Sequence, residues 1–160
     1  MTKQRATAVS WPNKPMPQNT KTLELAGSYS REEFVQISMG LIPKTKADKW
    51  FIYLDGEWLL FHRSQTGTCV FMLQMVPAEE GYEARTAVIN QDPAQYRSSS
   101  DEYDVELISY LVDHLLLGKF VPFPTPRHLA KGDHDRHQQH VMGEKPGGSL
   151  RLNVLNNGRH

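Results

Sequence analysis

Residues 49–63 read KWFIYLDGEWLLFHR, two apolar and aromatic runs on either side of an Asp-Gly pair. Aromatic and branched residues favour strands, and Asp-Gly is a strong hairpin signal because glycine accepts a positive φ at low cost. The stretch therefore predicts a β-hairpin with strands over 49–54 and 57–63 and a type I′ turn centred on Asp55 and Gly56.

Two further strands are expected downstream of this hairpin. Residues 68–76 form an apolar run that ends at Pro77, and residues 82–89 alternate in hydrophobicity. Both are joined to their neighbours by short polar turns, and short links between consecutive strands favour an antiparallel meander of four strands.

One helix is expected before the four predicted strands in the sequence, and one after them. Ser30 and Glu33 form a capping-box pattern at the start of a short helix that Gly40 and Pro43 end. A second helix follows a cap at Ser100 or Asp101, with six apolar residues at helical spacing: Val105, Ile108, Leu111, Val112, Leu115 and Leu116. The expected fold class is α+β: a four-stranded antiparallel meander packed against a C-terminal amphipathic helix, with a short N-terminal helix and flexible basic arms.

Prolines and charges divide the chain into three parts. Seven of the ten prolines and an excess of basic residues lie in the two ends, whereas residues 30–118 hold twice as many acidic as basic residues. Residues 1–20 and 124–149 also lack apolar periodicity. We therefore expect a flexible N-terminal arm over 1–20, a single α+β domain over 21–123, and a His-rich tail containing Pro and Gly over 124–160. The basic arms bind phosphate, fold back on the acidic body or simply keep the protein soluble.

Composition narrows the class of protein. With 160 residues, 39% of them hydrophobic and 22% charged, the chain has the size and composition of one globular domain. Its longest apolar runs span five residues, too few for a membrane span, and no secretory signal precedes them. The only cysteine, Cys69, has no partner for an internal disulfide, which favours a cytoplasmic protein.

The densest group of polar and reactive side chains lies at the end of the predicted hairpin, in residues 58–67, WLLFHRSQTG. A guanidinium, two hydroxyls and an amide in a Gly-terminated turn suit a phosphate or a carboxylate. The candidate ligand-binding residues are therefore His62, Arg63, Ser64 and Thr66. The alternative is an ordinary polar turn in which Ser64 and Thr66 bond to their own backbone.

Three segments carry a resemblance to other proteins: residues 48–54 (DKWFIYL), 58–67 (WLLFHRSQTG) and 103–107 (YDVEL). They resemble stretches of uncharacterised bacterial proteins with a DKWFIY…WLxFHRSxTG signature, and the resemblance covers roughly residues 30–118. It implies no established activity, so it transfers neither a function nor a site residue.

Three other groups of residues are candidates for function. Trp50, Tyr53 and Trp58 are candidate interface residues, because one helix cannot cover all the aromatic side chains of residues 50–71. His134, His137 and His140 are weak candidates for metal ligands, since no apolar stripe or cysteine would fix their geometry. Residues 150–155 alternate in part, which fits either a short strand at the sheet edge or a docking peptide.

The sequence favours a non-enzymatic interaction module that binds a partner protein or its own copy through an aromatic-rich sheet and the two arms. The first alternative is a module for a nucleotide or another small anion, bound at the His62–Thr66 turn. The second is a small hydrolase or transferase with His62 as the base, although no catalytic triad, carboxylate pair or metal set is recognisable. Nucleic acid is a weaker candidate partner because the basic residues are spread out, and no cofactor or membrane partner is expected.

Overall fold

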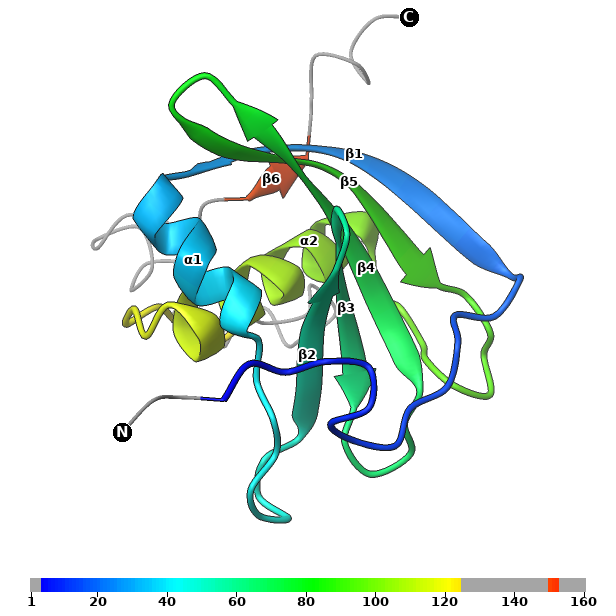
Figure 1. Cartoon of the computed structure of the whole chain (residues 1–160). Coiled ribbons are helices and arrows are strands. Elements are labelled where there is room, and N and C mark those ends of the chain that lie inside the picture. The colour runs from blue at the N-terminus through cyan, green and yellow to red at the C-terminus, as the bar shows by residue number, and fades with distance from the viewer. Residues whose placement is uncertain (1–3, 125–149, 153–160) are drawn as a thin grey trace, which may run out of the picture.

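Six strands form one antiparallel sheet in the order β2-β3-β4-β5-β1-β6, and two helices complete a mixed α/β fold (Figure 1). This computed structural model describes residues 4–124 and 150–152. The strands are β1 (Thr20–Tyr29), β2 (Trp50–Asp55), β3 (Trp58–Arg63), β4 (Cys69–Ala78), β5 (Gly81–Asn90) and β6 (Arg151–Leu152). The helices are α1 (Arg31–Met39) and α2 (Asp101–Tyr110), and the π-helical segment η1 (Leu111–Leu116) continues α2.

The antiparallel meander is present as β2-β3-β4-β5, but the turn of its first hairpin differs by one residue from the expected one. Asp55 pairs with Trp58, so the central residues are Gly56 and Glu57, and Gly56 has a φ of 63°. Glycine at the first central position is typical of a type II′ turn. This register pairs Leu54 with Leu59 on the core side and leaves Glu57 in the turn, whereas the expected register would have paired Leu54 with Glu57.

The expected four-stranded sheet is too small, because β1 and β6 extend it to six strands. β1 pairs with β5 along its length, and its inward side chains Leu23 and Leu25 are buried. Their alternation with Thr22 and Glu24 is a strand signal that the four-strand prediction leaves out. β6 pairs with β1, so residues 151–152 follow the edge-strand alternative for the C-terminal segment.

Both helices begin where the sequence predicts. Ser30 Oγ accepts from the N–H of Glu33 at 3.0 Å, and the N–H of Ser30 donates to Glu33 Oε1 at 2.9 Å, which completes the capping box. Ser100 caps α2 by accepting from the N–H of Tyr103. The π-helical turn of η1 was not predicted, since one apolar stripe fits both helix types.

The sheet is covered on both faces. One face and α2 enclose the main core, which includes Ile52, Phe61, Phe71 and Ile108. The other face is covered at β2 and β3 by residues 4–19, which we call the strap and which cross in front of these strands in Figure 1. No helix in the described part of the chain combines the length and apolar character needed to cross a bilayer.

The strap lies where the sequence predicts a flexible arm. Ala6 is fully buried beside Phe51 and Tyr53, and its N–H donates to Met39 O at 2.8 Å. The strap has no apolar periodicity because it is an extended segment anchored at single points rather than a helix or a strand. This packing also accounts for the apparent excess of aromatic residues, since the strap and α2 each cover part of them.

Candidate functional site

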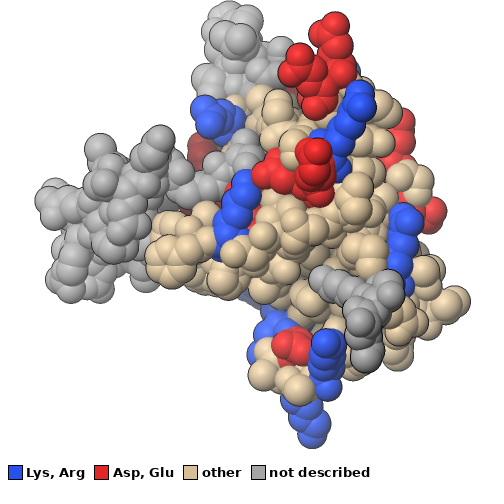
Figure 2. Space-filling view, turned by 60° about the vertical axis from the view of Figure 1, so that its left-hand side comes forward, with Lys and Arg blue, Asp and Glu red and all other residues tan. Residues whose placement is uncertain are grey.

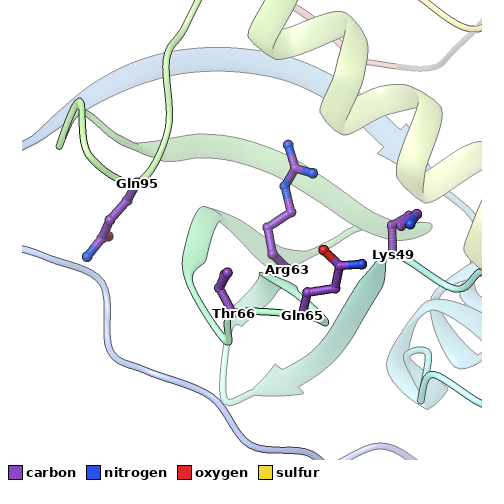
Figure 3. A pocket seen from close by; sticks show the side chains of 5 residues that line it. All are labelled: Lys49, Arg63, Gln65, Thr66 and Gln95. Atoms are coloured by element: carbon purple, nitrogen blue, oxygen red, sulfur yellow. The ribbon is translucent and has the colours of Figure 1, made fainter. Parts of the chain in front are cut away.

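A pocket of about 210 Å³, open to solvent, lies where β2 begins and β3 ends. Lys49 precedes β2, Arg63 ends β3, Gln65 and Thr66 belong to the β3–β4 turn, and Gln95 comes from the loop after β5. Figure 3 shows Lys49 and Gln95 on opposite sides of the pocket, with Arg63, Gln65 and Thr66 between them. Every described side chain that lines this pocket is polar, and none is a carboxylate.

The Arg63 guanidinium is held in place by an aromatic ring rather than by an acid. Its carbon lies 4.9 Å from the centre of the Trp50 ring, and Trp50 in turn stacks on Phe71 at 6.1 Å. Trp50 and Arg63 are direct partners in the β2–β3 register, which places both side chains on the same face of the sheet. Among the described residues, no carboxylate forms an ion pair with Arg63 or Lys49.

Ser64, which follows Arg63 in the chain, is hydrogen-bonded to the segment that carries Lys49, the other basic residue of the pocket. Its N–H donates to Lys49 O at 2.9 Å, and its hydroxyl donates to Asp48 O at 2.7 Å. The Asp48 carboxylate is turned back into its own loop, where it accepts from the N–H groups of Lys44 and Thr45. These hydrogen bonds lower the pKa of Asp48, and they leave Lys49 with no acidic partner inside this loop.

The turn between β3 and β4 is tightly closed by local hydrogen bonds. The N–H of Gly67 donates to Arg63 O at 2.8 Å, and Gly67 has a φ of 77° that favours glycine. Thr66 Oγ1 accepts from the N–H of Thr68 and lies 2.9 Å from Thr68 Oγ1. The turn therefore holds Arg63 and Gln65 on a fixed backbone, although the Thr66 hydroxyl is partly used by the turn itself.

The four predicted ligand-binding residues are divided by the fold. Arg63 and Thr66 line the pocket, and Ser64 lies behind it with its hydroxyl bonded to the backbone. His62 projects from the opposite face of the sheet, where it is 1% exposed between Phe51 and Tyr53. Strand alternation places His62 and Arg63 on opposite faces, so a single site containing both is not compatible with a regular β3.

Lys49 and Gln95 line the pocket but were not among the predicted site residues. Lys49 is the first residue of the predicted strand, and the observed register, which differs from the expected one, places it opposite the residue that follows β3. Gln95 lies in a polar loop far along the chain, and no sequence signal connects it with Arg63. Its side chain is fixed by Asn90, whose Nδ2 donates to Gln95 Oε1 at 2.8 Å.

Charges are distributed unequally between the two ends of the sheet. The loops at the pocket end carry Lys44, Lys46, Lys49, Arg63 and Arg97, and their carboxylates are Asp48 and Asp92. The β2–β3 and β4–β5 turns at the other end carry Asp55, Glu57, Glu79 and Glu80. Figure 2 shows mainly basic side chains on the lowest projection and several acidic ones near the top. This arrangement gives the pocket end an excess of basic side chains in a chain whose formal net charge is zero.

The predicted interface residues are largely used inside the domain. Tyr53 is only 7% exposed because the strap covers it, and one face of Trp50 carries Arg63. Trp58 remains half-buried at the start of β3. Exposed large apolar side chains occur elsewhere, at Val9, Val35, Phe120 and Phe123.

The remaining candidates give no additional site among the described residues. Burial raises the pKa of the Cys69 thiol to about 12, which fits a structural cysteine rather than a nucleophile. His114 Nδ1 lies 3.0 Å from Lys119 O, and its ring stacks on Tyr110. His134, His137 and His140 lie outside the described residues, and the described part of the chain contains no cluster of metal-ligating side chains.

Comparisons of the chain with protein-family models, with curated proteins and with solved structures give no match.

Proposed function

We propose that this chain is a non-enzymatic module that binds a small anion, such as a phosphate or carboxylate group of a larger ligand, in the Lys49–Arg63 pocket. The observation that carries the proposal is the pair of cations without a carboxylate partner among the described residues, joined in one pocket. A guanidinium offers paired N–H donors that match such an oxyanion. The stacking of Arg63 on Trp50 keeps this donor group in place before the ligand arrives, which lowers the entropic cost of binding.

Sulfate is a suitable probe because its charge does not change near neutral pH. We expect isothermal titration to detect sulfate binding to the wild type and a loss of about tenfold or more in affinity for Arg63→Ala, since charged hydrogen bonds are the strong ones. Arg63→Lys should retain part of the affinity, because the paired donors become a single point charge. Lys49→Ala should weaken binding as well.

Lys46→Ala is the matched control, since Lys46 lies in the same loop as Lys49 but does not line the pocket. Arg63 is exposed, so its removal should cost no more than about 1 kcal/mol of stability without ligand. Unchanged sulfate affinity together with a large loss of stability in Arg63→Ala would assign Arg63 a structural role and reject the site.

The second candidate function is the interaction module that binds a protein partner, and it is favoured by a different surface from the one expected. Phe120 and Phe123 follow η1 and are 91% and 57% exposed. Large aromatic side chains of this kind are enriched at protein interfaces. Light scattering over a concentration series tests a second copy as the partner, with Phe120→Ser reducing any self-association and Val9→Ser as the control.

A further inference from the structure

The strap contacts the reverse side of the turn that forms the candidate anion site. Trp11 Nε1 donates to Ser64 O at 2.8 Å, and the N–H of Lys14 donates to Gly67 O at 2.8 Å. The backbone passes so closely that a Cβ on Gly67 would lie 3.1 Å from the Cα of Asn13. Ser64 and Gly67 thus receive hydrogen bonds from the strap on one side while Arg63, Gln65 and Thr66 line the pocket on the other.

The same strap covers a buried histidine. The His62 ring lies 5.7 Å from the rings of both Phe51 and Tyr53, and a backbone hydrogen bond links it to Lys14 of the strap. Within the described residues, the Nδ1 atom of His62 has no hydrogen-bond partner although the side chain is 1% exposed. We call the arrangement in which the strap covers His62 the closed state. The unpaired Nδ1 atom lowers the stability of this closed state, and a positive charge on the ring would lower it further.

We propose that the strap regulates the anion site: docked, it holds the turn of residues 63–68 in its binding shape, and protonation of His62 releases the strap and lowers anion affinity. This inference rests on the proposed anion-binding function. Trp11 acts here as a positioning residue, because it touches the turn and not the pocket.

The direction of the pH effect follows from the surroundings of His62. Burial lowers the pKa of His62 in the closed state, and the Lys14 backbone opposes this shift only in part. The titratable groups that face it are Tyr53 on β2 and Cys69 on β4, and the pKa of each is raised, so both stay neutral near pH 7. Once the strap leaves, His62 regains an ordinary pKa of about 6.5, so the closed state is favoured above that pH and loses stability as the pH falls through it.

The positioning role is tested first at constant pH near 7.5 by sulfate titration. Trp11→Ala should lower sulfate affinity severalfold, Trp11→Phe should recover part of the loss through its ring, and Val9→Ala should behave as wild type because Val9 is 93% exposed. Thermal unfolding of each variant identifies those that remain folded. Wild-type affinity in folded Trp11→Ala would overturn the positioning role.

The proton-sensitive step is tested by labelling Cys69 with a dipyridyl disulfide in the presence and absence of sulfate. Cys69 pairs with His62 in the β3–β4 register and is fully buried, so its labelling reports release of the strap. The thiolate fraction and the protonation of the reagent both change with pH, so each rate is divided by that of a free thiol at the same pH. A higher relative rate at about pH 5.5 than at about pH 7.5 then reports opening. We expect this acceleration and a severalfold fall in sulfate affinity in the wild type, and neither in His62→Phe.

The outcomes separate this inference from the proposed function. A labelling rate of wild type, relative to the free thiol, that is equal or lower at the lower pH would overturn the switch, whatever the sulfate affinity. Faster labelling with unchanged sulfate affinity would overturn the coupling of the strap to the site while leaving the anion site intact. Opening at low pH in a protein that binds no sulfate at either pH would reject the proposed function and the regulatory role together, and would leave only a pH-dependent strap.

Discussion

The indole Nε1 of Trp11 donates a hydrogen bond to the carbonyl oxygen of Ser64 across 2.8 Å, joining residues that are 53 positions apart in the chain. The partly buried indole also packs against the apolar cluster of Ala6, Phe51 and Tyr53. This contact joins the strap to the β3–β4 turn, which carries part of the candidate site. We therefore expect the stability of the domain to depend on residues outside the predicted folded unit of 21–123.

Substitution of Trp11 tests that dependence. Trp11→Phe removes the hydrogen bond and keeps most of the ring, so we expect a loss of about 1 kcal/mol in the free energy of unfolding. Trp11→Ala also removes the packing, and we expect a loss of roughly 2 kcal/mol or more. Urea unfolding measures both, and wild-type midpoints for both variants would show that the Trp11 side chain contributes nothing to stability.

Ser64 should matter to stability and binding together, because it links the backbone at Asp48 and Lys49 to the turn. Ser64→Ala removes the side-chain bond to Asp48 O, and we expect a cost of about 1 kcal/mol and a severalfold lower sulfate affinity. Ser99→Ala, at an exposed position, is the control. If the sulfate affinity of Ser64→Ala stays constant while its free energy of unfolding falls, the spacing between Lys49 and Arg63 does not depend on the hydrogen bond from Ser64 to Asp48 O.

Asp104 is the fully buried member of an acidic pair that holds Lys21. Its carboxylate accepts from Tyr96 Oη at 2.6 Å and lies 2.9 Å from Lys21 Nζ, whereas Asp101 contacts the same lysine from a side chain that is 50% exposed. Asp104→Asn should cost about 3 kcal/mol in urea unfolding because it leaves a half-buried ammonium poorly paired. Asp101→Asn should cost less than about 1 kcal/mol, and equal effects would contradict the assigned burial.

Two glycines with positive φ differ in the space available for a side chain. Substituting each by alanine therefore separates the cost of backbone strain from the cost of steric overlap. Gly56 has a φ of 63°, and a Cβ added there would meet nothing within 4 Å, whereas a Cβ on Gly40, at a φ of 68°, would lie 2.2 Å from Ile52 O. Gly56→Ala should cost about 1–2 kcal/mol from backbone strain alone. Gly40→Ala should cost more than about 3 kcal/mol because strain and overlap add. Thermal and urea unfolding should rank the two variants in this order.

Glu33 gives a pH-dependent prediction. The hydrogen bond from Lys119 and then that from the Ser30 N–H lower the pKa of Glu33. Because the folded-state pKa is depressed, this contribution is complete above the unfolded pKa of about 4.3 and is lost as the pH falls through the folded-state value. Glu33→Gln should therefore be less stable by under about 1 kcal/mol at pH 7, since the pair is partly exposed. The difference in the free energy of unfolding between Glu33→Gln and wild type should vanish in acid. A difference that stays constant down to about pH 3 would contradict the lowered pKa of Glu33.

Local patterns were sufficient for the elements whose signals lie within a few residues. The helix caps at Ser30 and Ser100, the 50–63 hairpin and the apolar stripe after Val105 each depend on neighbouring residues, so the sequence predicts them. The hairpin turn was misplaced by one residue because two registers satisfy the Asp-Gly signal. Both registers keep Leu59 and Phe61 on the core face, and the observed one leaves Glu57 in the turn instead of pairing it with Leu54 on that face.

The sequence by itself determined an α+β domain with a meander, two helices and a polar turn at residues 62–67, because periodicity, capping and turn signals are local properties of the chain. Only the tertiary structure decided what covers the second face of the sheet, since an extended strap buries single residues and leaves no periodic signal. It also decided the composition of the pocket, because Lys49, Arg63 and Gln95 come from three separate parts of the chain. The same pleat that exposes Arg63 to this pocket buries His62 beneath the strap.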